Sequence, residues 1–403
     1  MRVYVGIDWS RQSHAVCCLT GEKTVIAEFT ISHEEEGFRA IQRRLLRLAP
    51  AGEILVGIET SYNVIVDFLL DAGFEVACIH PNQIHGDRKQ VSSSGAKSDR
   101  SDALLIARHL INNEDGLRTF KPDSEETVAL RQLVAERQAI VKEETSACNR
   151  LGSLLERYLP AALGLFSSYK SKIYRAFLRA FPNQEALEAA SLEDFRAFLV
   201  EQRYCKKVVA EDILASKKNA PAGARGLLGE VGSTCILAEV DKIEALCSIS
   251  KRLEKEMKKT LDAHADAEIF KSFPGADTVM ASRLLVSFGD DRTRFPHAES
   301  MASLIGIVPV SKASGKSKTV HFRRACNREG RHTFHLFTNL TRASTPWAQD
   351  RYLALREGGK SHAHALRVLG RSWLRIIHAC WKSRTLYDPG RTASRAPRKG
   401  ALR

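Results

Sequence analysis

The sequence has no long apolar run and no paired cysteine motif. No window approaches the roughly 18 consecutive apolar residues that a membrane-spanning helix requires, so we expect no transmembrane segment and no membrane partner. The nine cysteines are scattered, apart from adjacent Cys17 and Cys18, and form no Cys-x-x-Cys pair. This distribution argues against a zinc ribbon or a disulfide framework and favours a reducing cytoplasm. Residues 1–10 carry an acidic residue and no small-residue cleavage site, which predicts a strand rather than a signal peptide.

Acidic residues are scarce in the last quarter of the chain. Residues 306–403 hold 21 basic and 4 acidic side chains, whereas the remaining 305 residues hold 40 basic and 43 acidic ones. The net charge of +14 therefore arises entirely from this region. Such a focused positive field favours a polyanionic partner. Nucleic acid is a better candidate than an anionic membrane surface, because nothing resembles a lipid anchor.

Residues 1–121 alternate between strand and helix periodicity. The predicted strands are Val3–Trp9, His14–Thr20, Val25–Ile31, Ile54–Glu59 and Glu75–His80, and the predicted helices are 33–48, 62–72 and 98–111. A loop opened by Pro81 precedes the last helix. Three meandering strands followed by parallel strand–helix units are the order of the ribonuclease-H-like fold, in which strands one and four are central neighbours. Actin-like ATPases share this opening order, so the order alone does not select a function.

The rest of the chain is predicted to be helical. Apolar residues recur at helical intervals from about Val128 to Tyr158 and again from Ile236 to Leu261, which suits a coiled-coil arm over residues 122–265. Residues 266–382 form a mainly helical basic domain. It begins with a segment like a helix-hairpin-helix around Gly275, for which an ordinary helical hairpin is the alternative. Residues 383–403 are expected to be a disordered basic tail. The fold class is therefore α/β plus all-α.

Four carboxylates stand out in the first domain. Asp8 lies inside an apolar strand and Glu59 ends another, where each is either solvated at the strand end or bound to metal. Asp99 and Asp102 begin a helix three residues apart, and a helix N-cap explains Asp99 well but Asp102 less well. If the helix packs across strands one and four, all four carboxylates converge. Such a cluster of oxygen ligands suits two Mg²⁺ ions in phosphodiester transfer.

A second group of candidate residues lies in a basic segment after Gly306. Pro309 and Gly315 predict a loop there. The basic residues expected to contact nucleic acid are Lys312, Lys316, Lys318, Arg323, Arg324, Arg328 and Arg331. Farther along, His362 and His364 are two residues apart on a predicted helix and therefore diverge, so we interpret them as surface or DNA-facing residues rather than a metal pair.

The motifs GIDWS, IET and KSDRSDA, in this order and spacing, resemble the DEDD motif of transposases of the insertion sequence 110 family. The resemblance covers nearly the whole chain and implies a RuvC-like nuclease domain at the N-terminus, with Asp8, Glu59, Asp99 and Asp102 as catalytic metal ligands. It also implies a nucleophilic serine directly before a glycine, a position that Ser314 occupies. Lys316 replaces the usual second glycine, and Ser311 and Ser317 are the competitors.

The family resemblance further implies the partners. These are donor and target double-stranded DNA, together with a structured bridge RNA that guides the recombinase by base pairing. Since the serine and the carboxylates lie in different domains, the active site is expected to form between protomers of a dimer or tetramer.

Three other functions compete with this interpretation. A RuvC-like junction-resolving nuclease would use the carboxylates without a serine step, but leaves the basic C-terminal region unexplained. An actin-like kinase would need a second phosphate loop with Asp-Gly-Gly, which the sequence lacks. A non-catalytic DNA-binding protein would leave the carboxylates without a role.

Overall fold

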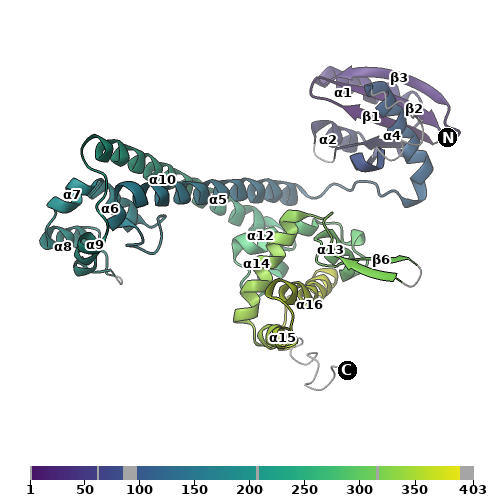
Figure 1. Ribbon diagram of the computed structural model, residues 1–403. Helices are drawn as coiled ribbons and strands as arrows, with labels where there is room; N and C mark the ends of the chain where they lie inside the picture. Colours follow the sequence, from purple (N-terminus) through teal and green to yellow (C-terminus); the bar gives the residue numbers. More distant parts are fainter. Residues whose placement is uncertain (1, 61–62, 85–97, 206–207, 315–316, 391–403) are drawn as a thin grey trace. The chain divides into compact units, whose positions relative to one another are not determined.

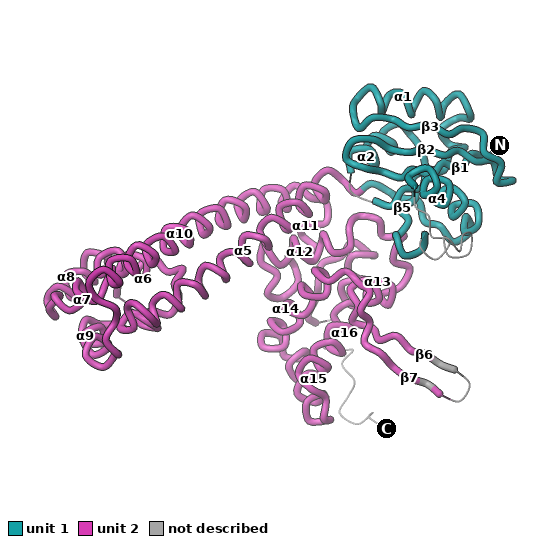
Figure 2. Tube along the Cα trace, turned by 45° about the horizontal axis from the view of Figure 1, so that its top comes forward, with its two compact units in different colours: residues 1–122 teal, residues 123–403 magenta. Residues whose placement is uncertain are grey.

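The computed structural model describes residues 2–60, 63–84, 98–205, 208–314 and 317–390. The chain divides into two compact units, Met1–Pro122 and Asp123–Arg403 (Figure 2). Within the described ranges, no helix combines the length and the apolar character needed to cross a membrane.

A five-stranded mixed sheet forms the centre of the first unit. Its strands are β1 (Val3–Trp9), β2 (Ser13–Thr20), β3 (Val25–Ser32), β4 (Ile54–Ile58) and β5 (Glu75–Cys78). Their order is β3-β2-β1-β4-β5, with antiparallel pairs along β1, β2 and β3 and parallel pairs along β1, β4 and β5. Short turns join only antiparallel strands, whereas parallel strands need crossover helices. The ribonuclease-H-like order is confirmed, including the central pairing of β1 with β4.

Helices cover both faces of this sheet (Figure 1). They are α1 (Glu35–Leu46), α2 (Val64–Asp71) and α4 (Asp99–Asn113). Successive side chains of a strand point to opposite faces. Thus Val5 and Ile7 of β1 join the core beneath α1 and α2, whereas Tyr4 joins the core beneath α4. Residues 81–84 are helical where a loop was predicted, because proline is well suited to a first helical turn.

Two long helices, α5 (Glu125–Tyr158) and α10 (Gly226–Ala263), run side by side in the second unit (Figure 1). Ion pairs join Arg137 to Glu254 at 2.6 Å and Arg150 to Glu239 at 2.9 Å. Residue numbers rise along α5 while those of the partners fall along α10, so the pair is antiparallel. Four shorter helices lie at its far end: α6 (Lys172–Ala180), α7 (Gln184–Ala189), α8 (Leu192–Glu201) and α9 (Ala210–Asn219).

The near ends of α5 and α10 share a core with the C-terminal helices. Leu130 of α5 and Leu261 of α10 belong to the same buried cluster as Phe337 and Trp373. The helices around this core are α11 (Ala267–Lys271), α12 (Thr278–Phe288), α13 (Ala298–Leu304), α14 (Arg328–Ser344), α15 (Pro346–Glu357) and α16 (His362–Ser383). The predicted boundary between residues 265 and 266 thus falls inside one compact unit.

Two segments of the second unit differ from expectation. The basic segment predicted as a loop contains an antiparallel hairpin of β6 (Val310–Ser314) and β7 (Ser317–His321), in which the β-branched residues Val310, Thr319 and Val320 favour an extended backbone. Tyr387, expected to belong to a disordered tail, packs on the C-terminal core. There the Tyr387 hydroxyl accepts a hydrogen bond from Trp347 Nε1 at 3.1 Å, and its ring packs against Phe273. Residues 391–403 lie outside the described ranges.

Candidate functional site

Asp8 and Glu59 lie at the C-terminal ends of the two central parallel strands. Asp8 is the second-last residue of β1, and Glu59 directly follows β4. The register places Ile7 opposite Ile58, so the next residues along the two strands are these two acids. Both are half-buried. The topology therefore places two carboxylates next to each other along one sheet edge.

Both carboxylates share the sheet face that α4 covers. Asp8 follows Tyr4 and Gly6 in the alternation of β1, and Glu59 continues the alternation of Leu55 and Gly57. Tyr4 and Leu55 pack against α4. This placement follows from the two-residue period of the strands.

Helix α4 approaches β1 closely at Gly6. A Cβ at this position would lie 2.5 Å from the backbone nitrogen of Ala107 and closer still to the carbonyl oxygen of Ala103. At the other end of the contact, the Tyr4 hydroxyl donates to Glu114, just beyond the C-terminal end of α4. The N-terminal end of α4 consequently points toward Asp8, so Asp102, directly before Ala103, belongs to the same end of the sheet.

The two acids of α4 have different environments. The Asp102 residue is 4% exposed, whereas Asp99 is exposed at the first helical position. Ser98 is the N-cap: its hydroxyl accepts from the Ser101 amide at 3.2 Å, and the Ser101 hydroxyl accepts from the Ser98 amide at 3.1 Å. The interpretation of Asp99 as a cap is therefore wrong. Its carboxylate can instead interact favourably with the helix N-terminus.

The donor set of Asp8, Glu59 and Asp102 fits a hard divalent cation, because it consists of carboxylate oxygens alone. Among the described residues, however, no three His, Cys, Asp or Glu side chains stand close enough together to hold a metal ion. The structure thus brings three predicted carboxylates to one end of one face without gathering them into a ligand cluster. Asp99 remains on the exposed side of the helix.

The candidate serines lie on the β6–β7 hairpin. Ser314 ends β6 and pairs with Ser317 at the start of β7, while Ser311 pairs with Val320. Ser311 and Ser317 are exposed. Lys316 and the side chains of Ser314 and Lys318 lie outside the described part of the chain.

Some of the predicted basic side chains are exposed, and others donate hydrogen bonds to backbone carbonyls. Lys312, Arg324 and Arg328 are exposed. Arg323 instead donates to the Val308 carbonyl at 3.3 Å, and Arg331 donates to the Arg323 carbonyl at 2.5 Å. These two arginines therefore also hold the chain around the hairpin in place.

Sequence reasoning missed the residues that accompany Arg331. Its guanidinium lies 4.5 Å from the ring centroid of Phe322, and the guanidinium of Arg367 on α16 lies 5.4 Å from the same centroid. An aromatic residue inside the basic run His321–Arg324 was the available signal. Arg367 is distant in sequence and only the packing of α16 brings it there.

The segment resembling a helix-hairpin-helix has the predicted helix–turn–helix form but a packed turn. Gly275 has φ +71°, and a Cβ there would lie 2.5 Å from Leu340 Cδ2. Asp277 caps α12, accepting from the Met280 amide at 2.8 Å. A packed turn with an acidic cap favours the ordinary helical hairpin over a phosphate-binding turn.

Comparison with known proteins gives matches at both ends of the chain. Residues 5–160 match the profile of the IS110 DEDD transposases, described as "Transposase", and residues 267–353 match the profile described as "Transposase IS116/IS110/IS902 family". The first range contains the four carboxylates and the second contains the hairpin with Ser314.

Two relatives match this chain over almost their full lengths. The "Mini-circle putative transposase for IS117" of Streptomyces coelicolor is 28% identical, with 97% of this chain and 96% of the relative covered. The "Insertion element IS110 uncharacterized 43.6 kDa protein" of the same species is 26% identical, with 96% and 95% covered. Among solved structures, T. thermophilus RuvC in complex with a Holliday junction substrate is 16% identical and covers 30% of this chain and 100% of its own, with a TM-score of 0.23.

Proposed function

The chain belongs to the IS110 family of transposases, and from this premise we propose that it cuts and rejoins DNA strands with its N-terminal carboxylates, a C-terminal serine and a guide RNA. Membership of the family implies DNA transposition and therefore enzymatic cleavage of DNA. One observation supports the finer proposal: Asp8 and Glu59 follow each other across two neighbouring strands, on the sheet face covered by α4, and buried Asp102 lies in the first turn of that helix.

The carboxylates are proposed to hold Mg²⁺. Asp8, Glu59 and Asp102 would supply the ligand oxygens, and Asp99 would join from the first turn of α4. When bound, Mg²⁺ polarises a phosphodiester and stabilises the charge that develops on its oxygens. Rigid strand ends suit this role because they hold the acids at fixed spacing before the cation arrives.

Ser314 is proposed as the nucleophile. Its hydroxyl oxygen would attack the phosphorus, forming a serine–phosphate ester while the bond from phosphorus to one deoxyribose oxygen breaks. The serine proton leaves to solvent or a nearby base, and the departing oxygen takes up a proton. The ester preserves the phosphodiester bond energy, so a second strand's hydroxyl can displace the serine and reseal DNA without another energy source.

The basic surface of the second unit is proposed to hold both nucleic acids. Exposed Lys312, Arg324 and Arg328 would contact phosphates of donor and target DNA or of a bridge RNA. Because phosphate contacts carry no sequence information, base pairing with the RNA would select the sites.

A covalent-adduct assay tests the catalytic assignments. With DNA substrate, Mg²⁺ and the guide RNA, wild type should form a protein–DNA adduct that survives denaturation, and Ser314→Ala should not. Asp8→Ala, Glu59→Ala and Asp102→Ala should abolish strand cleavage. Asp99→Ala, on the same helix as Asp102, should reduce cleavage less. Thermal unfolding and DNA binding of each variant serve as folding controls.

Several outcomes would redirect the proposal. An adduct that persists in Ser314→Ala and vanishes in Ser311→Ala or Ser317→Ala moves the nucleophile. Normal cleavage without any adduct favours a hydrolytic, junction-resolving nuclease. Undiminished Mg²⁺-dependent cleavage by Asp8→Ala contradicts the metal assignment.

The active site is further proposed to form between protomers of a dimer or tetramer. The carboxylates and Ser314 belong to different compact units, which permits an arrangement in trans. Mixing Asp8→Ala with Ser314→Ala protein should then restore part of the activity that each lacks alone. If no mixture exceeds the separate proteins, while co-purification shows that mixed oligomers form, the site is built within one chain.

A further inference from the structure

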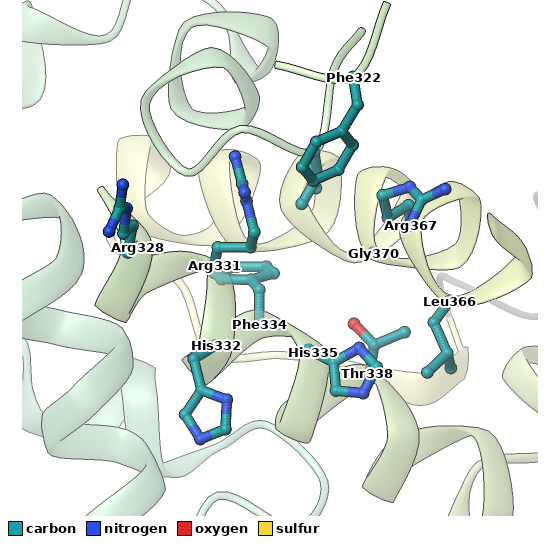
Figure 3. Close-up of a pocket in the computed structure, with 11 residues that line it drawn as sticks. Phe322, Arg328, Arg331, His332, Phe334, His335, Thr338, Leu366, Arg367 and Gly370 are labelled. Carbon is teal, nitrogen blue, oxygen red and sulfur yellow. The ribbon is translucent and has the colours of Figure 1, made fainter. Parts of the chain in front are cut away.

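A cavity of about 240 Å³ lies between α14 and α16, beside the chain segment that follows β7 (Figure 3). Ligand pockets for drug-sized molecules typically span about 300–1,000 Å³. The smaller volume here suits a single nucleobase rather than a large ligand.

All the ionisable side chains that line the cavity are basic. Arg328, Arg331 and Arg367 line it together with His332 and His335, and no Asp or Glu is among its lining residues. Burial, reinforced by the neighbouring basic groups, lowers the pKa of His335, so the arginines supply the positive charge. Such a set of donors favours an anion, because guanidinium groups match phosphate oxygens in charge and geometry.

Arg367 differs from the other arginines on its face of α16. Arg371 and Arg375 follow it at intervals of one turn, and each forms an ion pair with Glu299, at 3.1 and 3.0 Å. Arg367 instead lies over the ring of Phe322. Its charge therefore remains available at the cavity, whereas Glu299 offsets the charge of the next two arginines.

An aromatic layer forms one side of the cavity. Phe322 is 51% exposed, with the guanidinium groups of Arg331 and Arg367 near its ring (Figure 3). Unstacked bases in protein complexes stack on aromatic rings and on guanidinium planes alike. The layer thus offers a stacking surface next to the positive charge.

A buried hydroxyl lies at the opposite side of the cavity. Thr338 is 1% exposed, and its Oγ1 has no hydrogen-bond partner among the described residues. Gly370 makes room beside it, since a Cβ there would lie 3.2 Å from this oxygen. An unpaired buried hydroxyl is costly, and the polar edge of a base could satisfy it.

We propose that this cavity binds one unstacked nucleotide of a bound nucleic acid, with its phosphate at Arg328 and Arg331 and its base between the Phe322 layer and Thr338. The proposal rests on the proposed nucleic-acid binding of the second unit and adds Phe322, Thr338 and Arg367 to it. The unstacked nucleotide can come from an RNA bulge or from distorted DNA, because both present the same phosphate and base.

Fluorescence anisotropy with short labelled duplexes tests the proposal on the full-length protein. Three forms of each duplex are compared, in RNA and in DNA: fully paired, with a single bulged adenosine, and with an abasic bulge. Wild type should bind the adenosine bulge about tenfold more tightly than either other form, as expected for one stacked base. A preference in the RNA series identifies the guide as the source, and one in the DNA series identifies the substrate.

Two conservative variants assign the preference to the cavity. Phe322→Leu should bring the ratio of bulged to paired affinity close to one. Thr338→Val, which keeps the side-chain shape and removes the hydroxyl, should lower it by roughly threefold to tenfold. Arg375→Gln, on the same helix face but paired with Glu299, should leave the ratio unchanged.

Equal, tight binding of all three duplex forms by wild type would overturn the pocket while leaving the proposed function intact. A preference that survives both Phe322→Leu and Thr338→Val would overturn its location. Failure to bind any duplex would instead count against the proposed function itself.

Discussion

His14 is a fully buried histidine in β2, and its Nε2 lies 2.9 Å from Nδ1 of His33. Its own Nδ1 has no hydrogen-bond partner among the described residues. Burial, followed by the neighbouring His33, lowers the pKa of His14 from 6.5 to about 4. The imidazole is therefore neutral in the folded protein at pH values where it would be charged in an unfolded chain.

This residue predicts an acid-sensitive first unit. The neutral imidazole costs no unfolding free energy above pH 6.5, where the unfolded chain is also neutral at this residue. As the pH falls from 6.5 toward 4, the unfolded chain takes up a proton that the folded protein does not, so the unfolding free energy decreases, by about 2 kcal/mol at pH 5. Hydrogen exchange of β2 amides, corrected for intrinsic rates, should show this loss. His14→Gln, whose amide reaches the position of the imidazole Nε2, should flatten the pH dependence, whereas His364→Gln, at an exposed position of α16, should not. Equal β2 protection at pH 7 and pH 5 in wild type would contradict the assignment.

Asp290 illustrates the opposite kind of buried group in the second unit. Although burial alone would raise its pKa, hydrogen bonds from His264, Ser124 and Thr127 lower it well below the usual range. The Ser124 amide lies 2.6 Å and the Thr127 hydroxyl 2.7 Å from its carboxylate oxygens. The ionised side chain thereby joins the start of α5 to the residues that follow α12.

At the scale of elements, the contact of α4 with β1 decides where Asp102 lies. The contact requires a glycine, because the backbones of Gly6 and α4 leave no room for a Cβ. The position of the buried acid consequently depends on a residue that carries no side chain.

Gly6→Ala should therefore displace α4 and reduce both stability and cleavage. We expect a loss of about 1–3 kcal/mol in the unfolding free energy, typical of overpacking. Strand cleavage should fall, while binding of nucleic acid by the second unit is retained. Gly52→Ala is the matched control, since a Cβ there meets nothing within 4 Å. If a stably folded Gly6→Ala protein cleaves DNA as fast as wild type, cleavage does not depend on the position of α4.

At the scale of the whole molecule, the positive charge is concentrated in part of the second unit. Truncation near Ile305 would remove this charge, but it would also remove Phe337 and Trp373 from a core that Leu130 and Leu261 share. Substitution of exposed basic residues is therefore a cleaner test than truncation.

Salt dependence measures the phosphate contacts. Each contact removed should make the slope of log affinity against log salt shallower by about 0.7–0.9. Lys312→Gln with Arg324→Gln should thus reduce the slope by roughly 1.4–1.8. Arg39→Gln with Arg43→Gln in α1 changes the net charge equally, but these arginines pair with Glu35 and Glu36 and should leave the slope nearly unchanged. Identical slopes for the two double variants would refute a localised binding surface.

The element order and the family were predictable from the sequence alone. Strand alternation and helical intervals are local properties, so Val3–Trp9 was predicted at its observed bounds and the first arm helix was predicted close to Glu125–Tyr158. The second arm helix begins at Gly226, ten residues before the predicted start at Ile236, because Gly226, Gly229 and Gly232 weaken the helical signal there. The motifs around Asp8, Glu59 and Asp102 predicted the family because their residue types and order can be recognised without coordinates.

Only tertiary structure decided which residues meet. Ser98 and Asp99 are both residue types that cap helices, and only the backbone conformation shows that Ser98 is the N-cap of α4. The hairpin at Ser314 forms because two segments with weak strand signals pair with each other. The cavity beside Phe322 required Arg367 and Thr338, which come from different helices. Sequence periodicity determines the face on which a side chain lies, whereas the partner it meets across that face depends on how distant segments pack.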